Sequence, residues 1–384
     1  MLDILPLHGA TPRILVFGVG GCGCNTINQL SQAPLNSNVQ LIAINTDAQS
    51  LATTQCDTRI QIGPETTKGL GAGAKPSRGE QAAQESALQL KERIEIADVV
   101  FITGGMGGGT GTGAMPQIAA FAAELDKPLV AVVTLPFSFE GKHRNQLATE
   151  GVEQLMQHAS AVIVLPNDQL AKTLGSKVTV INAFFQSNRI LQDVLHGLTA
   201  TISQSGLINI DLNDFIEIIS HPGRAAMGVA RHTNDDDLQL TINNALKNPL
   251  LEDIDLTLAK GAIVSVMASQ QIELSQYHQI GETLQQQLSA NALVIIGLTI
   301  VPELDCELEL MVIATGIAPQ SSASAPNIKT ITVPHIDTST LLNIHDFLNE
   351  HSANSCLDVD NKYQDTELDI PTYVRHKTNA KPSW

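Results

Sequence analysis

Aromatic side chains are scarce in this sequence: Phe, Tyr and Trp make up 3% of its 384 residues, whereas hydrophobic residues make up 43%. The chain is long and apolar enough for two folded domains, but their cores must be mainly aliphatic and alanine-rich. Basic residues are also few, since 22 Lys and Arg stand against 39 Asp and Glu, and the net charge is −17. Such a surface repels phosphate groups, so we expect neither nucleic acid nor anionic lipid as a direct partner.

Metal-type clusters, targeting segments and membrane spans are missing as well. The five cysteines include no CxxC pair and the eleven histidines are scattered, which disfavours a zinc site. We expect these thiols to be reduced in the cytoplasm. No apolar run approaches the roughly 20 residues of a spanning helix, and the N-terminal residues lack the basic region of a signal peptide. We therefore expect a cytoplasmic protein that reaches membranes only through other proteins.

Apolar runs alternate with helical patterns in the first part of the chain. Continuous β-branched runs predict buried strands at 13–20, 39–47, 97–105, 128–136 and 160–168. A helix is predicted at 25–32, between the first two strands. Buried strands separated by helices indicate a Rossmann-like parallel sheet with helices on both faces.

A long helix and a second α/β region follow. Apolar residues keep helical spacing from about 180 to 204, which corresponds to roughly 37 Å of helix ending near Gly206. Beyond it the patterns predict helices in 237–249 and 277–290 and three strands. These strands are expected at 259–269, 291–302 and 307–317. The fold class predicted from the sequence is therefore α/β, with two unequal domains joined by the central helix.

Two glycine loops carry the chemistry. "GVGGCG" (18–23) follows a strand and precedes a helix, which fits the dinucleotide pattern GxGxxG but is a weak signal alone. "GGMGGGTGTG" (104–113) has the same setting and holds seven glycines in ten positions. Backbone N–H groups of such a loop, with hydroxyls of Thr110 and Thr112, would form a second phosphate nest. A nicotinamide dehydrogenase needs only one such loop, whereas a polyphosphate uses two, and no GxxxxGK[ST] P-loop occurs.

At this point the chain resembles FtsZ, the bacterial tubulin-like family of cell-division GTPases. The resemblance covers about residues 13–318 and returns in the last twenty. The segments that carry it are "GVGGCGCN" (18–25), "NTD" (45–47), "TKGLGAGA" (67–74), "GGGTGTG" (107–113), "PFSFEGKHR" (136–144), "PND" (166–168) and "NIDLNDF" (209–215). Together these segments are far more specific than any one of them, and they imply a tubulin-like fold that binds GTP or GDP with Mg²⁺ bridging the phosphates.

The resemblance also implies roles for particular residues. The glycine loops and the loop 71–73 would surround the phosphates, Glu140 and Arg144 would contact ribose and phosphate, and Phe184 and Asn188 would contact guanine. An Asn amide suits the donor–acceptor edge of guanine. The nucleotide-binding residues so expected are Gly20, Gly21, Asn25, Asn45, Asp47, Gly71, Ala72, Gly73, Gly107, Gly108, Gly109, Thr110, Gly111, Thr134, Pro136, Glu140, Arg144, Phe184 and Asn188.

The residues expected to complete hydrolysis are Asn209, Asp211 and Asp214, which would orient the attacking water. Helix capping by Asp211 or Asn213 is the competing interpretation. The base-contacting residues begin the long helix and the carboxylates lie beyond its end, some 35 Å away by helix rise. They would therefore act on the nucleotide of a neighbouring subunit, in a head-to-tail filament. By resemblance, this is the polymer of the cytokinetic (Z) ring at midcell.

Six segments result: 1–12, a flexible N-terminus; 13–179, the GTP-binding domain; 180–206, the central helix; 207–318, the C-terminal α/β domain; 319–364, a flexible linker; and 365–384, a tail peptide. The tail resembles the family's docking peptide for membrane-anchoring division proteins, with contacts expected from Asp369, Ile370, Pro371, Tyr373, Val374 and Arg375. The alternative for the tail is an ordinary disordered terminus. Departures from the family at Cys22, Arg189 and His221–Pro222 keep open a weakly hydrolysing paralogue that acts as a scaffold or regulator.

Overall fold

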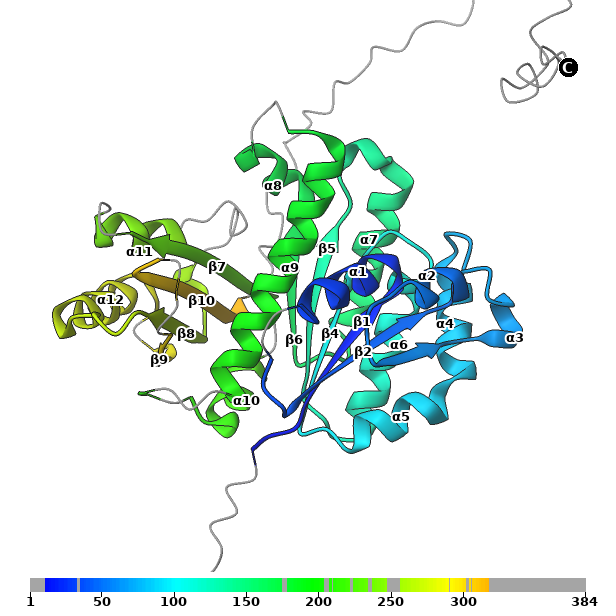
Figure 1. Cartoon of the computed structure of the whole chain (residues 1–384), viewed down its shortest axis with the longest axis horizontal. Helices are drawn as coiled ribbons and strands as arrows, with labels where there is room; N and C mark the ends of the chain where they lie inside the picture. The colour runs from blue at the N-terminus through cyan, green and yellow to red at the C-terminus, as the bar shows by residue number, and fades with distance from the viewer. Residues whose placement is uncertain are drawn as a thin grey trace, which may run out of the picture. The chain divides into compact units, whose positions relative to one another are not determined.

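The computed structural model describes residues 11–317, apart from 33–34, 175–177, 204–206, 209, 222–223, 234–236, 247–255, 290, 302–303 and 305. Gly206, Asn209, Pro222, the linker 319–364 and the tail 365–384 lie outside these residues. The described residues belong to one compact unit, built on a ten-stranded sheet of order β3-β2-β1-β4-β5-β6-β7-β10-β8-β9 (Figure 1).

The first six strands form a parallel sheet with helices on both faces. They are β1 (Ile14–Val19), β2 (Val39–Asn45), β3 (Thr58–Gln61), β4 (Val99–Gly105), β5 (Leu129–Leu135) and β6 (Ala161–Pro166). The helices are α1 (Gly20–Leu30), α2 (Ala48–Ala52), α3 (Pro64–Thr67), α4 (Pro76–Glu85), α5 (Ala87–Glu95), α6 (Thr110–Glu124), α7 (Lys142–Leu155), α8 (Asn167–Leu174) and α9 (Val180–Ser203), with a 3₁₀ turn at Ser138–Glu140.

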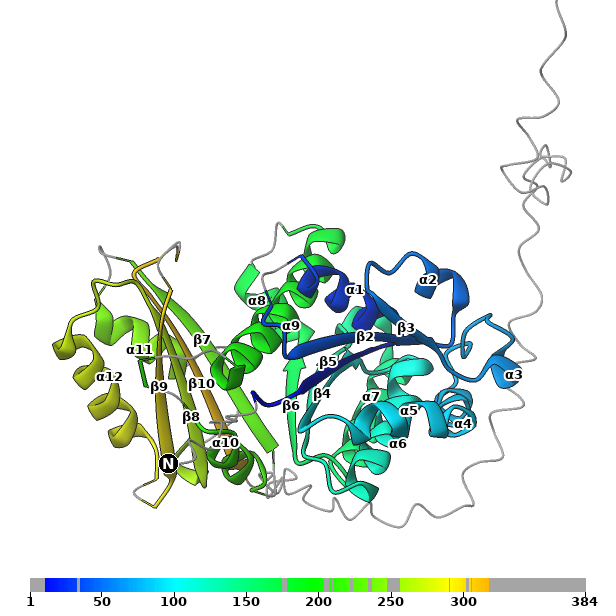
Figure 2. The same cartoon turned by 60° about the horizontal axis from the view of Figure 1, so that its bottom comes forward.

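Strand β1 shows why the sheet is buried on both sides. All six of its residues are buried. Ile14 and Val16 pack with α1 and α9, whereas Leu15, Phe17 and Val19 pack with α4, α5 and α6. Figure 2 shows the same division, with α1, α2 and α9 on one face of the sheet and α4 to α7 on the other. Successive side chains of the strand thus point to opposite faces of the sheet, and each face packs into its own aliphatic core, as is usual for a parallel sheet.

The second half of the sheet is mixed. Strand β10 (Leu308–Ile317) runs antiparallel to β7 (Arg224–His232) and β8 (Gly261–Ala268), and β8 runs parallel to β9 (Leu293–Ile300). Its helices are α10 (Leu212–Ile219), α11 (Leu238–Leu246) and α12 (Leu274–Gln287), with a 3₁₀ turn at Leu256–Leu258. Only two residue pairs join β6 to β7. The predicted boundary between two domains falls at this narrow junction, and the division itself stays a prediction.

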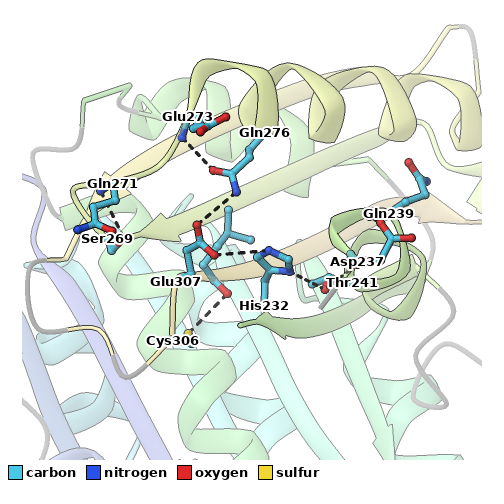
Figure 3. A network of polar contacts seen from close by, with 11 residues as sticks. His232, Asp237, Gln239, Thr241, Ser269, Gln271, Glu273, Gln276, Cys306 and Glu307 are labelled. Carbon is cyan, nitrogen blue, oxygen red and sulfur yellow. Dashed lines mark hydrogen bonds and ion pairs between the residues drawn. The ribbon is translucent and has the colours of Figure 1, made fainter. Parts of the chain in front are cut away.

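A polar network ties β7, α11 and β10 together (Figure 3). His232 is 4% exposed at the end of β7, and its Nδ1 lies 3.1 Å from the Thr241 hydroxyl on α11. Its Nε2 lies 3.7 Å from the Glu307 carboxylate, which also accepts a hydrogen bond from the Gln276 amide at 3.3 Å. His232 and Thr241 are buried, so each provides a hydrogen-bond partner that the other would otherwise lack.

The predicted fold class and the predicted strands and long helix are confirmed. The predicted helix at 25–32 begins earlier, at Gly20, because the chain turns from β1 directly into α1. The prediction of three strands in the second region was wrong: β7 is a fourth, and its sequence RAAMGVARH is too poor in β-branched residues to indicate a strand. Strand β3 was missed because it has only four residues.

Candidate functional site

A cavity of about 400 Å³ opens at the carboxyl ends of β1, β4, β5 and β6. Ligands of parallel α/β sheets bind at this edge. The cavity is lined by Val19, Gly20, Gly21, Cys22, Asn25, Gly105, Met106, Gly108, Gly109, Thr110, Gly111, Thr134, Pro136, Glu140, Arg144, Asn167, Phe184, Ser187 and Asn188. Thirteen of these nineteen were predicted from the sequence.

The first glycine loop meets the second one at its turn. Gly20 has φ +73°, and a Cβ there would lie 3.3 Å from the backbone nitrogen of Gly111. Gly20 also begins α1, so the unpaired N–H groups of that helix start at the cavity. At Gly21 a Cβ would meet no atom within 4 Å. The loop therefore gives an anion open access to backbone donors.

The glycines of 104–113 serve two different needs. At six of the seven, an added Cβ would come within 3.1 Å of a neighbouring atom, the extreme being 1.9 Å from the Pro76 carbonyl oxygen at Gly113. Five of these six allow close packing against a neighbouring backbone segment, and Gly105 makes room for the Cys22 side chain. Gly108 is the exception, because a Cβ there would meet nothing within 4 Å, and Gly108 lines the cavity. Of the two threonines predicted as donors, Thr110 lines the cavity, whereas Thr112 is buried and accepts the N–H of Gly107 at 2.8 Å.

The loop at 71–73 packs against the second glycine loop and is separated from the cavity by it. Ala72 is buried, and a Cβ on Gly109 would lie 2.8 Å from the Cβ of Ala72. Gly71 and Gly73 have φ of +80° and +60°. None of the three lines the cavity, nor does Gly107. Their contacts with a nucleotide stay predictions.

Asn45 and Asp47 organise the turn after β2. The Asp47 carboxylate caps α2 by accepting the N–H groups of Gln49 and Ser50 at 2.9 and 3.0 Å. The Asn45 amide accepts the Asp47 N–H at 3.2 Å and donates to the Ser50 hydroxyl at 3.2 Å. Neither side chain lines the cavity, so the structure gives both a structural task, and nucleotide contacts stay predicted.

Among the residues that the structure describes, the charged side chains in the cavity wall are Glu140 and Arg144. The Arg144 guanidinium contacts the Glu140 carboxylate at 2.7 Å, and its Nε donates to the Gly107 carbonyl at 3.4 Å. Glu140 also accepts the N–H of Phe137 at 2.9 Å. The pair holds the guanidinium beside the second glycine loop, where its remaining N–H groups could donate to a bound anion.

An aromatic and amide group forms the other end of the cavity. Phe184, on α9, is 39% exposed and meets Phe137 edge-on at a centroid distance of 5.1 Å, while Phe137 stacks on Phe139 at 4.9 Å. Asn188 follows one helical turn after Phe184 and also lines the cavity. An exposed ring beside a carboxamide offers stacking and hydrogen bonding to a heterocyclic base.

Sequence reasoning missed Asn167 and Ser187 in the wall of the cavity. The Ser187 hydroxyl contacts the Asn167 carboxamide oxygen at 2.6 Å, and both residues are buried. The "PND" segment signalled Asn167 through its place directly after β6. Ser187 gave no signal, because its role depends on the packing of α9 against the start of α8. Val19, Cys22, Gly105 and Met106 also line the cavity; they lie inside the two glycine loops but were not among the predicted nucleotide-binding residues.

The predicted carboxylates lie far from this cavity. Phe215 on α10 packs on Phe101 of β4 at a centroid distance of 6.2 Å, near the amino-terminal end of that strand. Asp211 occupies the N-cap position of α10 but makes no capping hydrogen bond through its side chain, and Asp214 lies in the first turn. Both are exposed. The hydrogen bond that capping by Asp211 would require is therefore not present. Within the described part of the subunit, neither carboxylate has a hydrogen-bond or ion-pair partner.

A larger hollow of about 1120 Å³ lies at the opposite edge of the sheet, between the starts of β1, β2 and β3. It contains none of the predicted site residues, so its size does not make it the functional site. Within the described residues, no cluster of His, Cys, Asp and Glu has the composition of a metal site. The same residues include no helix that is long and apolar enough to cross a membrane.

Comparisons with known proteins agree with this geometry. Residues 13–175 match the model of the Tubulin/FtsZ family GTPase domain, and residues 223–318 match the FtsZ family C-terminal domain. The cell division protein FtsZ of Coxiella burnetii is 36% identical over 369 residues, which cover 96% of this chain and 90% of that protein. FtsZ of Wigglesworthia glossinidia brevipalpis is 40% identical over 319 residues, covering 83% and 82%. A solved dimer of FtsZ from M. jannaschii superposes with a TM-score of 0.76 at 38% identity, covering 79% of this chain and 88% of that one.

Proposed function

The chain belongs to the FtsZ family of tubulin-like, GTP-binding cell-division proteins, and on this premise we propose that it polymerises head to tail on GTP into the filaments of the cytokinetic ring. Hydrolysis of each GTP to GDP and phosphate is completed by Asp211 and Asp214 of the adjacent subunit, together with Asn209. The observation that carries the proposal is the separation of the phosphate loops from these carboxylates.

The cavity supports GTP as the ligand. Its two glycine loops and the starts of α1 and α6 offer backbone N–H groups for phosphate oxygens, and Arg144 adds a positive charge beside them. Phe184 offers a ring for stacking on guanine, and Asn188 and Asn167 offer amides for its edge. Mg²⁺ would be held mainly by the phosphates, because no protein cluster competes for it among the described residues.

The length of α9 supports catalysis in trans. Its N-terminal residues line the cavity, and its 24 residues span about 36 Å by helix rise before the chain reaches Asp211. The packing of α10 near the amino-terminal end of β4 puts the carboxylates at the opposite edge of the sheet from the phosphate loops. A second subunit stacked on the first would bring the two edges together, and such a contact repeats into a filament.

The test compares wild type with Asp214→Ala. Wild-type GTP turnover per subunit should rise above a threshold protein concentration, at which pelleting begins. Asp214→Ala should bind GTP with a Kd within about twofold of wild type but hydrolyse it about a hundredfold more slowly, because it lacks a group that positions the water. Glu217→Ala is the control, since it removes another exposed carboxylate of α10.

Two outcomes would contradict the proposal. Turnover per subunit that does not depend on concentration would place the whole catalytic site in one subunit. Wild-type turnover by Asp214→Ala would show that the carboxylate has no part in hydrolysis. If the wild-type protein itself bound GTP and pelleted but hydrolysed GTP only marginally, that would instead support the scaffold or regulator that the departures at Cys22, Arg189 and His221–Pro222 leave open.

A further inference from the structure

Cys22 lies where three elements of the cavity meet. It belongs to the first turn of α1, its Sγ is 3.5 Å from the Asn188 carboxamide oxygen on α9, and the same Sγ is 3.8 Å from the Thr134 hydroxyl on β5. The absence of a side chain at Gly105 makes room for it, because a Cβ at Gly105 would lie 3.1 Å from the Cβ of Cys22. The thiol is thus packed against the residue expected to contact the base.

The direction of these hydrogen bonds follows from the protonation of the thiol. Burial raises the pKa of Cys22 to about 11, so the sulfur keeps its proton at neutral pH. A thiol has one proton to donate, and the carboxamide oxygen of Asn188, at 3.5 Å, is closer than the Thr134 hydroxyl oxygen, at 3.8 Å. The Thr134 hydroxyl can then donate to the sulfur. Hydroxyl, thiol and carboxamide form a chain in which each donor strengthens the next.

This chain selects one orientation of the Asn188 amide. If the amide were turned by 180°, the thiol would donate to the Thr134 hydroxyl instead, and the NH₂ group of Asn188 would have only the sulfur, a weak acceptor, in reach. The carboxamide oxygen is the stronger partner for the thiol, so the observed orientation is favoured. With the oxygen toward Cys22, the NH₂ group is left to face the cavity. A purine with a 6-oxo group presents an acceptor to such a donor, whereas a 6-amino purine presents another donor.

We propose that Cys22 is a positioning residue that sets base specificity, by holding the Asn188 amide with its NH₂ group toward the base so that guanine is preferred over adenine. The inference rests on the proposed function, because it takes GTP to be the ligand and Asn188 to be its base contact. It adds a residue and a physical cause for the choice between the two purines.

The experiment measures Kd for GTP, ATP and ITP on wild type, Cys22→Ala and Cys22→Ser by competition with a fluorescent GTP analogue. In Cys22→Ala, the Kd for ATP divided by the Kd for GTP should fall by about three- to tenfold, the range expected for the loss of one hydrogen bond. Cys22→Ser should restore the ratio, because a hydroxyl also donates. ITP keeps the 6-oxo group without the 2-amino group, so its Kd should change in parallel with that of GTP.

Two further variants separate positioning from folding. Cys24→Ala removes a thiol from the same helix that does not line the cavity, and it should leave the ratio unchanged. In an Asn188→Ala background, Cys22→Ala should have no further effect on the ratio, since the thiol acts through that amide. The proposal is overturned if Cys22→Ala keeps the wild-type ratio, if Cys22→Ser fails to restore it, or if the effect persists without Asn188. Failure of the wild-type protein to bind GTP would instead overturn the proposed function.

Discussion

Gly108 and Gly113 stand five residues apart, and we expect opposite effects from the same substitution. Gly113→Ala should lower the free energy of unfolding by about 1–3 kcal/mol, because its Cβ would collide with the Pro76 carbonyl at the α4–α6 contact. Gly108→Ala should keep stability within about 0.5 kcal/mol of wild type. It should weaken GTP binding at least about tenfold, since the Cβ would keep phosphate from charge-assisted backbone hydrogen bonds.

Urea denaturation and nucleotide titration of both variants check this pair. The two variants control for each other, because Gly113→Ala is expected to lose stability and Gly108→Ala is expected to lose GTP affinity while keeping its stability. GTP binding by Gly108→Ala at wild-type strength would show that the backbone at this position does not approach the phosphates. The glycine content of the loop would then serve close packing alone.

Among the elements, the junction of β7, α11 and β10 depends on one buried histidine. His232→Ala should lower the free energy of unfolding by about 1–3 kcal/mol, because the Thr241 hydroxyl and the Glu307 carboxylate each lose a partner. GTP binding should not change, since no residue of the network lines the cavity. Urea denaturation and GTP titration measure the two effects.

His278→Ala is the matched control on α12. His278 pairs with Glu282 at 3.6 Å, but their side chains are 71% and 63% exposed, so its loss should change stability by less than about 0.5 kcal/mol. If the two substitutions lowered the free energy of unfolding equally, burial of the His232 network would make no extra contribution to stability. A weaker GTP affinity in His232→Ala would mean that this junction is coupled to the nucleotide site.

At the scale of the whole molecule, assembly and docking should be separable. Deleting residues 365–384, which lie outside the described part of the structure, should leave GTP hydrolysis and pelleting intact and abolish binding to membrane-anchored division proteins. The 46 residues of 319–364 would have a root-mean-square reach of about 35–40 Å if they behave as a flexible chain. The tail could then search for a partner while the core stays in a filament.

Fluorescence anisotropy of a 365–384 peptide with candidate division proteins, beside pelleting of the shortened chain, tests this separation. In the peptide, Pro371 would reduce the ordering cost of binding, and Ile370, Tyr373 and Val374 would supply apolar contacts. A shortened chain that no longer pellets or hydrolyses GTP would place the tail within the assembly machinery instead.

Local signals predicted most of the strands and the long helix, but fewer than half of the helices that the structure describes. The strands around residues 14–19 and 99–105 were predictable because an unbroken apolar run bounded by glycine has few other structures available. The α9 helix was predictable from its spacing of apolar residues. Strands β3 and β7 were not, because one is very short and the other is held in the sheet by its neighbours rather than by β-branched residues of its own.

By itself the sequence determined the two glycine loops, the long helix between the nucleotide residues and the carboxylates, and the family to which these patterns belong. These features depend on residue order and backbone geometry within short segments. Only the tertiary structure decided that Gly108 is open while Gly113 is packed, that Asn167 and Ser187 join the cavity wall, and that Cys22 contacts Asn188. Each of these depends on atoms that are distant along the chain and meet only when α1, α4, α6 and α9 pack around the sheet.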